Sequence, residues 1–155
     1  MVTIEQIKEL RDRTGISIAQ CKKALEEAGG DMDKALAVLK SQGAAIAGKK
    51  SSRTLGAGKV SAYIHSNNTI GAMIQIHSET DFVSKSPEFR VLAEDLVMHI
   101  AAMNPVDIAE LLEQSFIKDP SLTIKDLIQS YVQKFGERIE VTRFVRFDTA
   151  LAFEE

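Results

Sequence analysis

An acidic side chain stands beside a large aromatic one in the segment Glu79–Val83, which reads Glu-Thr-Asp-Phe-Val. An alternating apolar run, 70–76, precedes this segment, and Ser86-Pro87-Glu88, typical of a helix start, follows it. Side chains at the junction of a strand and a helix are well placed to meet a partner. Burial tendencies alone nevertheless favour a core position for a phenylalanine such as Phe82.

The residue patterns that usually carry catalysis or hold a metal do not occur in this sequence. The glycine spacings match no phosphate-binding loop, and no paired His-Glu zinc motif is found. The single cysteine, Cys21, excludes an internal disulfide and a multi-cysteine metal site. Cys21 falls on the apolar stripe of its predicted helix, so we expect it to be a small buried residue. His99 is expected on the polar, exposed side of its helix. We therefore predict a binding protein, with no catalytic residue, metal or cofactor.

Composition narrows the class of protein further. The chain has 155 residues, of which 26% are charged and 45% hydrophobic, as in ordinary globular proteins. The net charge of -3 gives no basic footprint for direct nucleic-acid binding. No apolar run approaches the roughly 18 residues that a membrane span needs, and the N-terminus lacks a signal-peptide core. We expect a cytoplasmic protein that binds no membrane.

Three short helices are predicted over residues 1–42. Capping residues at Thr3, Ser17 and Asp31 each precede a narrow apolar stripe at helical spacing. Short helices of this kind are stable only when they bury their stripes against one another, so we predict a three-helix module. Residues 43–58 are rich in glycine, serine and cations and are predicted to be a linker, helical at most in its alanine-rich start.

A β-hairpin is predicted from the two alternating runs 60–64 and 70–76. A three-residue loop, 67–69, places the apolar residues of both runs on one face, whereas a two-residue loop mixes apolar and polar residues. We therefore predict the longer loop, with Val60 opposite Ile76, Ala62 opposite Ile74 and Ile64 opposite Ala72.

Three more helices are predicted: one over 87–102, a shorter one that starts at Asp107, and one from Thr123 to 135. A last strand over 139–147 is predicted to return to the sheet. Arg143 lies on the apolar face of that strand and Phe144 on the other face, so either a bulge or burial on both faces is expected. The predicted fold class is α+β: an N-terminal three-helix, ubiquitin-associated-like module and a core of a small three-stranded antiparallel sheet packed with helices. The core domain is expected over 59–148 and a frayed tail over 149–155.

Three segments of the chain resemble one family, bacterial elongation factor Ts. Thr14-Gly15, the run Cys-Lys-Lys-Ala-Leu-Glu-Glu-Ala at 21–28 and Gly30-Asp31 are similar to its N-terminal module. Glu79–Val83 resembles the most characteristic motif of the family, and the run Gly-Glu-Arg-Ile at 136–139 resembles the opening of its returning strand. The resemblance covers nearly the whole chain, in the right order.

The resemblance implies a guanine-nucleotide exchange factor for elongation factor Tu in translation elongation, rather than an enzyme. In the family, the motif enters the GTPase domain of elongation factor Tu near its magnesium site. Carried over to this chain, Phe82 would wedge between partner side chains, Asp81 would disturb the groups that hold magnesium, and Thr80 and Val83 would shape the loop. The weaker partner contacts that the resemblance implies are Ile18, Ala19, Phe135 and Gly136.

Two departures from the family pattern concern the partner contacts and the oligomeric state. Where the family often has two methionines and an aspartate before the cysteine, this chain has Ile-Ala-Gln at 18–20, so Ala19 offers less bulk. Longer members carry a second core subdomain and a coiled-coil hairpin, whereas one core unit resembles the short forms, which act as dimers. The resemblance therefore implies a homodimer, expected through an edge of the short sheet.

Two other functions compete with this interpretation. A non-enzymatic adaptor would use the ubiquitin-associated-like module to bind nascent chains or ribosomal partners, and would expose an apolar patch on its first and third helices. A small metal-dependent hydrolase would use His77, Glu79 and Asp81, which are close in sequence but lack the spacing of helical metal ligands.

Overall fold

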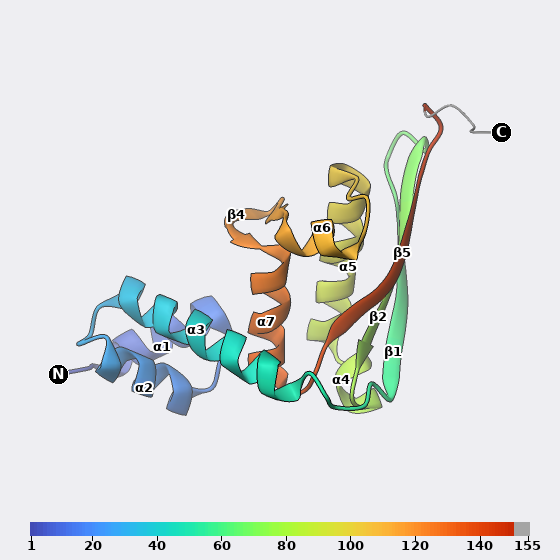
Figure 1. The fold of residues 1–155 in the computed structure, drawn as a ribbon. Coiled ribbons are helices and arrows are strands. Elements are labelled where there is room, and N and C mark those ends of the chain that lie inside the picture. The colour runs from blue at the N-terminus through green and yellow to red at the C-terminus, as the bar shows by residue number, and fades with distance from the viewer. Residues whose placement is uncertain (151–155) are drawn as a thin grey trace. The chain divides into compact units, whose positions relative to one another are not determined.

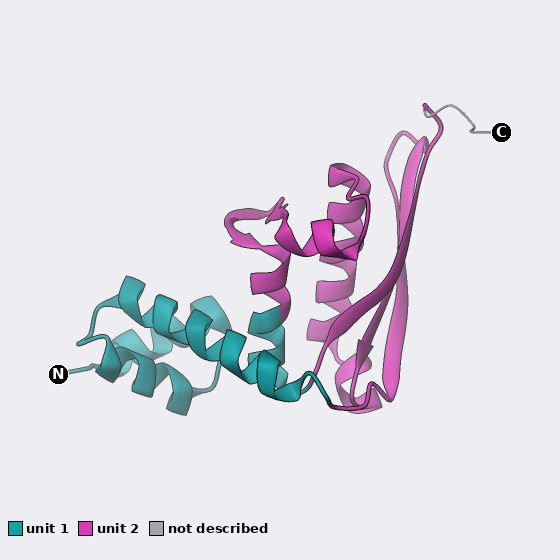
Figure 2. Ribbon diagram, viewed as in Figure 1, with its two compact units in different colours: residues 1–52, 129–137 teal, residues 53–128, 138–155 magenta. Residues whose placement is uncertain are grey.

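A computed structural model describes residues 1–150 of the chain, and its helices and strands are labelled in Figure 1. The described part divides into two compact units (Figure 2). Unit 1 holds residues 1–52 and 129–137, and unit 2 holds residues 53–128 and the described residues from 138 on. The segment 129–137, expected in the core domain, thus groups with the N-terminal helices. None of the helices among the described residues is long and apolar enough to cross a membrane.

Three helices, α1 (Ile4–Thr14), α2 (Ile18–Glu27) and α3 (Met32–Lys50), begin unit 1. Each begins at the predicted capping residue, whose side chain accepts a hydrogen bond from a backbone N–H in the first turn. After α1, Gly15 has a φ of 68° and closes the helix in the left-handed conformation. These local signals explain why the helix starts follow the sequence so closely.

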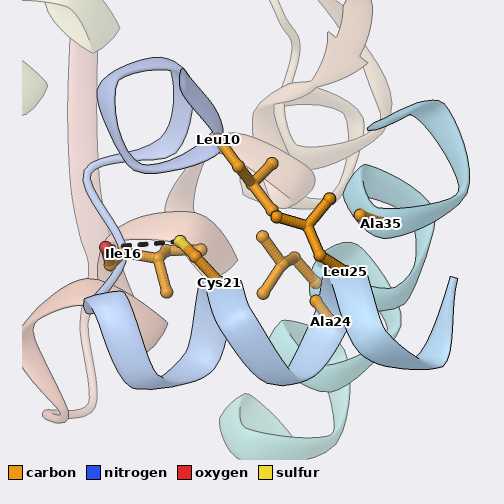
Figure 3. Packing of buried hydrophobic residues seen from close by; sticks show 7 residues of the cluster. Leu10, Ile16, Cys21, Ala24, Leu25 and Ala35 are labelled. Carbon is orange, nitrogen blue, oxygen red and sulfur yellow. Dashed lines mark hydrogen bonds between the residues drawn. The ribbon is translucent and has the colours of Figure 1, made fainter. Parts of the chain in front are cut away.

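The core of unit 1 lies between these helices (Figure 3). Leu10, Leu25 and Ala35, one from each helix, are fully buried. Cys21 is buried among them, 3.6 Å from the carbonyl oxygen of Ile16, and burial raises the pKa of its thiol. The prediction of Cys21 as a small buried residue is confirmed.

Helix α3 continues to Lys50 and so includes residues 43–50, which were expected in a linker. Only residues 51–56 connect it to the first strand. Gly43 is buried on α3, and a Cβ added there would lie 2.9 Å from Oε1 of Gln133. The glycines that suggested a linker therefore include one that allows close packing inside unit 1.

Unit 2 is built on a three-stranded antiparallel sheet in the order β1-β2-β5. Its strands are β1 (Ala57–Ile64), β2 (Ile70–Ser78) and β5 (Glu140–Asp148). Helix α5 (Pro87–Met103) packs against β1 and β2 (Figure 1), and Ile74 and Ile76 are buried on the inner face of the sheet. The predicted fold class is confirmed: it combines N-terminal helices with a small antiparallel sheet that is packed with helices.

The predicted hairpin register is wrong. Val60 pairs with Gln75, Ala62 with Met73 and Ile64 with Gly71. The loop is even in length, because the N–H of His65 donates to the carbonyl of Ile70 at 2.9 Å and leaves residues 66–69 between them. A Cβ at Gly71 would lie 2.7 Å from Cδ1 of Ile64, so this register uses the glycine to seat the isoleucine. The assumption that all apolar residues of β1 face inward fails, since Val60 and Ile64 are exposed.

Of the two alternatives expected for the last strand, a bulge and burial on both faces, the structure has the bulge. The pairing of β2 with β5 shifts between Gln75 and Ile76, so that Thr142 has no partner in the register. On one side of the shift Val141 is buried, and on the other Val145 and Phe147 are exposed. The extra residue moves the later apolar side chains to the outer face.

Short elements complete unit 2 and the chain. Between β2 and α5 lies a single turn, α4 (Asp81–Ser84), and after α5 come α6 (Ile108–Glu113) and a two-stranded ribbon that the sequence did not predict. The ribbon consists of β3 (Ser115–Phe116) and β4 (Asp119–Thr123), and α7 (Ile124–Phe135) follows it. Of the expected tail, Thr149 donates a backbone hydrogen bond to Thr69 at 2.9 Å, and residues 151–155 lie outside the described residues.

His99 is fully buried, so its predicted exposed position is wrong. Its Nδ1 accepts from the N–H of Ile117 at 3.2 Å, and its Nε2 then donates to Oε1 of Gln114 at 3.0 Å. Burial lowers the pKa of the imidazole, in part offset by the Gln114 hydrogen bond. The helical period could not reveal this position, because the unpredicted ribbon provides Phe116 beside the ring.

Candidate functional site

The Glu79–Val83 motif ends β2 and forms the one-turn helix α4. Thr80 is the N-cap, with extended φ and ψ of -126° and 155°, and its hydroxyl accepts from the N–H of Val83 at 3.5 Å. The N–H of Lys85 donates to the carbonyl of Asp81 at 3.0 Å, which closes the turn. We refer to Thr80–Ser84 as the motif turn.

Within the motif turn, two adjacent apolar residues differ strongly in their exposure. Phe82 is 88% exposed, whereas Val83 is 2% exposed. Phe89, seven positions later on α5, is by contrast fully buried. An isolated turn of helix cannot bury both sides, so Val83 anchors it and Phe82 is presented outward.

Asp81 is also exposed, directly before Phe82. The motif turn therefore presents a carboxylate and an aromatic ring next to each other. A large exposed aromatic ring is costly to leave in water and is typical of the anchors found at protein interfaces. This pair is suited to a contact with another protein.

Hydrogen bonds on both sides hold the motif turn in place. The hydroxyl of Ser78, a buried residue at the end of β2, donates to the carbonyl of Thr80 at 2.9 Å. The hydroxyl of Ser86, the N-cap of α5, donates to the carbonyl of Val83 at 2.8 Å. The turn is thus supported by a strand on one side and a helix on the other, as a pre-organised contact requires.

The other predicted contact residues all belong to unit 1. Ile18 is 54% exposed and Ala19 is exposed, both in the first turn of α2. Phe135 is half-buried at the end of α7, and Gly136 follows with a φ of 70°. Unit 1 therefore offers apolar groups at the start of α2 and at the end of α7.

Unit 1 brings these two segments together although they are far apart in sequence. The side-chain amide of Gln133 donates to Oε1 of Gln20 at 3.3 Å. A Cβ added at Gly15 would lie 3.2 Å from Nζ of Lys134, and that ammonium group lies 5.9 Å from the ring centre of Phe135. The connection between α1 and α2 and the end of α7 thus form one surface.

The structure gives little support to either competing function. In residues 1–150, no group of three or more His, Cys, Asp or Glu side chains could hold a metal ion. His77 bonds through one ring nitrogen to the carbonyl of Ala57 at 3.1 Å and through the other to Gln75 at 2.9 Å. For the adaptor, Ile4 of α1 is exposed, but no large apolar side chain of α3 is among the exposed ones in the described part.

From the sequence, Glu79 was expected only as the first residue of the motif and as a ligand in the competing metal site. In the structure its carboxylate is largely buried and contacts Arg138, which is 59 positions away. No spacing rule signals a pair so distant, and the resemblance assigned contact roles only to the residues that follow Glu79.

Comparisons with known proteins identify the family. A family model described as Elongation factor TS matches residues 43–105 and 79–154. Proteins named Elongation factor Ts from Herpetosiphon aurantiacus and Carboxydothermus hydrogenoformans are each 38% identical, over 95% and 96% of this chain and 97% and 89% of theirs. One from Thermodesulfovibrio yellowstonii is 39% identical over 99% of both chains. The alignment with the Herpetosiphon protein spans 192 positions, more than the 155 residues here, so that relative has internal residues without a counterpart in this chain.

Proposed function

Because this chain belongs to the elongation factor Ts family, and so to the translation elongation factors, we propose that it releases GDP from elongation factor Tu. The observation that carries the proposal is the motif turn, which leaves Phe82 88% exposed next to Asp81. The chain acts in the cytoplasm as a guanine-nucleotide exchange factor, with no cofactor. It makes and breaks no covalent bond and is therefore not an enzyme.

Exchange requires that the factor prefer the empty partner to the GDP-bound one. Phe82 enters the GTPase domain of elongation factor Tu as a wedge, and Asp81 disturbs the groups that hold magnesium there. Magnesium offsets the clustered charge of the phosphates, so its displacement weakens GDP binding. By linkage, the factor weakens GDP binding by the same ratio as GDP weakens binding of the factor. Nucleotide binding therefore releases the factor for another round.

The second contact region lies on unit 1. Its surface includes Ile18, Ala19, Phe135 and Gly136, and its exposed apolar groups support binding to the same partner. We assign this region to affinity rather than to the release step, because its expected contact residues carry no charge. Neither region requires nucleic acid.

Release of a fluorescent GDP analogue from elongation factor Tu tests the proposed function. Substoichiometric amounts of the chain, at millimolar magnesium, are expected to accelerate release in proportion to their concentration, because a factor that dissociates acts repeatedly. Release that stays at its intrinsic rate across the titration would show that this chain is not an exchange factor.

A homodimer is also part of the proposal, and the outer face of the sheet supports it better than an edge does. The large apolar side chains exposed on that face are Val60, Ile64, Met73, Val145 and Phe147. Met73 pairs with Val145 on β5 and with Ala62 on β1, so the apolar residues run across all three strands. A continuous apolar face of this kind is rare on monomers and is buried by self-association in many dimers.

A charge at the centre of this face is expected to separate the dimer. Light scattering should give twice the mass of one chain for the wild type and the mass of a single chain for Met73→Lys, because a buried unpaired charge is strongly disfavoured. Val91→Lys is the control, since Val91 is 46% exposed on α5, outside the sheet, and this variant should remain dimeric. A monomeric wild type, or a dimeric Met73→Lys, contradicts this arrangement.

A further inference from the structure

The carboxylate of Glu79 lies at the base of the motif turn and is bonded on both sides. Its Oε2 accepts from the backbone N–H of Arg138 at 2.7 Å, and its Oε1 lies 3.4 Å from Nη1 of Arg53. The Glu79 side chain is only 14% exposed. A short hydrogen bond from a backbone N–H to a carboxylate is among the stronger kinds.

Arg138 joins these residues into one network. Its Nη1 donates to the carbonyl of Arg53 at 2.6 Å, and its Nε and Nη2 donate to Oε1 of Glu140 at 2.9 and 2.7 Å. The backbone is equally close here, because a Cβ added at Gly56 would lie 2.9 Å from the carbonyl oxygen of Glu79. Three segments, 53–56, 79 and 138–140, therefore meet immediately before the motif turn.

We propose that Glu79 is a positioning residue for nucleotide exchange, an inference that rests on the proposed function. Glu79 directs its own side chain to Arg138 and Arg53, away from any partner, and acts through the residues that follow it. With Glu79 held to the start of β5 and to the segment before β1, the backbone that enters the motif turn has one direction. The direction of this backbone determines the positions of the Asp81 and Phe82 side chains.

The position of the network in the chain adds to this role. Arg53 and Arg138 are the residues at which the chain enters unit 2 from unit 1. The carboxylate thus ties the motif turn to both of these entry points.

A double-mutant cycle separates positioning from stability. Glu79→Ala is expected to lower the rate of GDP release about fivefold, within the range found for residues that act through their neighbours. Combined with Phe82→Ala, it should cause no further loss beyond about twofold, because a misdirected turn matters only while it carries the wedge. If the two losses multiply in the double variant, Glu79 and Phe82 act independently, as they would if Glu79→Ala only lowered the fraction of folded protein. That result would overturn the proposal.

Two further variants keep the test valid if Glu79→Ala folds poorly. Glu79→Gln retains an oxygen that accepts from the N–H of Arg138, so it should keep most of the exchange rate. Glu94→Ala is the matched control, because Glu94 forms an exposed ion pair with Arg90 at 3.3 Å on α5, and its loss should leave the rate unchanged. A Glu79→Gln variant as slow as Phe82→Ala, or an equally slow Glu94→Ala, would overturn the positioning role.

Hydrogen exchange of the backbone amides gives a measurement that does not depend on the partner. In the full chain, Glu79→Ala should accelerate exchange at residues 80–85 and leave the amides in the middle of α5 unchanged. Unchanged protection at 80–85 overturns the role of Glu79, even if the wild type is an active exchange factor. If the wild type does not release GDP but hydrogen exchange at 80–85 is still faster in Glu79→Ala, the proposed function is overturned instead. That result would still show that Glu79 stabilises the motif turn.

Discussion

Phe82→Ala is expected to abolish most of the exchange activity while leaving the protein folded. Phe82 is 88% exposed, so truncation removes few internal contacts, and the free energy of unfolding should change by less than about 1 kcal/mol. At an interface, loss of a central aromatic anchor typically costs at least about 2 kcal/mol, which corresponds to a fall of about 30-fold in the rate of GDP release. Thermal unfolding and GDP release, measured on the same preparation, test both parts.

Phe89→Ala is the matched control, since it makes the same substitution at a phenylalanine that is fully buried on α5. Phe89→Ala should lower the free energy of unfolding by about 3–5 kcal/mol, as truncation of other buried aromatic residues does. Exchange by the fraction of Phe89→Ala that remains folded should be close to that of the wild type. A Phe82→Ala variant that loses stability as Phe89→Ala does would place Phe82 in the core and remove the basis of the wedge.

Asp81→Asn is expected to slow exchange in a manner that depends on magnesium. The substitution keeps the size of the side chain and removes its charge, so the defect should be about tenfold at millimolar magnesium, which corresponds to about 1.4 kcal/mol of coupling. As magnesium is withdrawn, less ion remains to be displaced and the defect should shrink. The measurement is the rate of GDP release across a magnesium titration at constant free nucleotide.

Phe82→Ala provides the comparison for this titration, because a wedge remains useful when the ion is absent and its defect should persist. A defect of Asp81→Asn that is constant at every magnesium concentration would refute the charge role. Asp81 would then be a residue that supports the motif turn, whose backbone carbonyl already accepts from Lys85 at 3.0 Å.

The starts of the helices could be predicted from the sequence because their signals are local. Thr3, Ser17, Asp31 and Ser86 each cap a helix at the expected place, and each acts on a backbone N–H three positions away. The bulge in β5 was one of two alternatives that the sequence offered, since Arg143 breaks an alternation that is visible within nine residues. The resemblance, in turn, located the motif turn without any knowledge of its conformation.

The direction of Phe82 could not be predicted from burial tendencies, which favour the core for a phenylalanine. The motif turn has one buried side, and Val83 occupies it. Which of two neighbouring apolar residues points inward depends on where β2 ends and where α5 begins. That geometry involves residues on both sides of the turn and is not contained in a hydrophobic pattern.

The sequence by itself determined most of the elements of this protein, their order and the family, because caps, periods and motifs are properties of short segments. Only the tertiary structure decided the hairpin register, the burial of His99 and the bonds of Glu79 to Arg138 and Arg53. Each of these depends on surfaces that meet from distant parts of the chain: α5 covers one face of the sheet, the β3–β4 ribbon lies over the imidazole, and the start of β5 reaches the end of β2. Free energy gained by covering such surfaces exceeds the small local preferences on which sequence patterns rest.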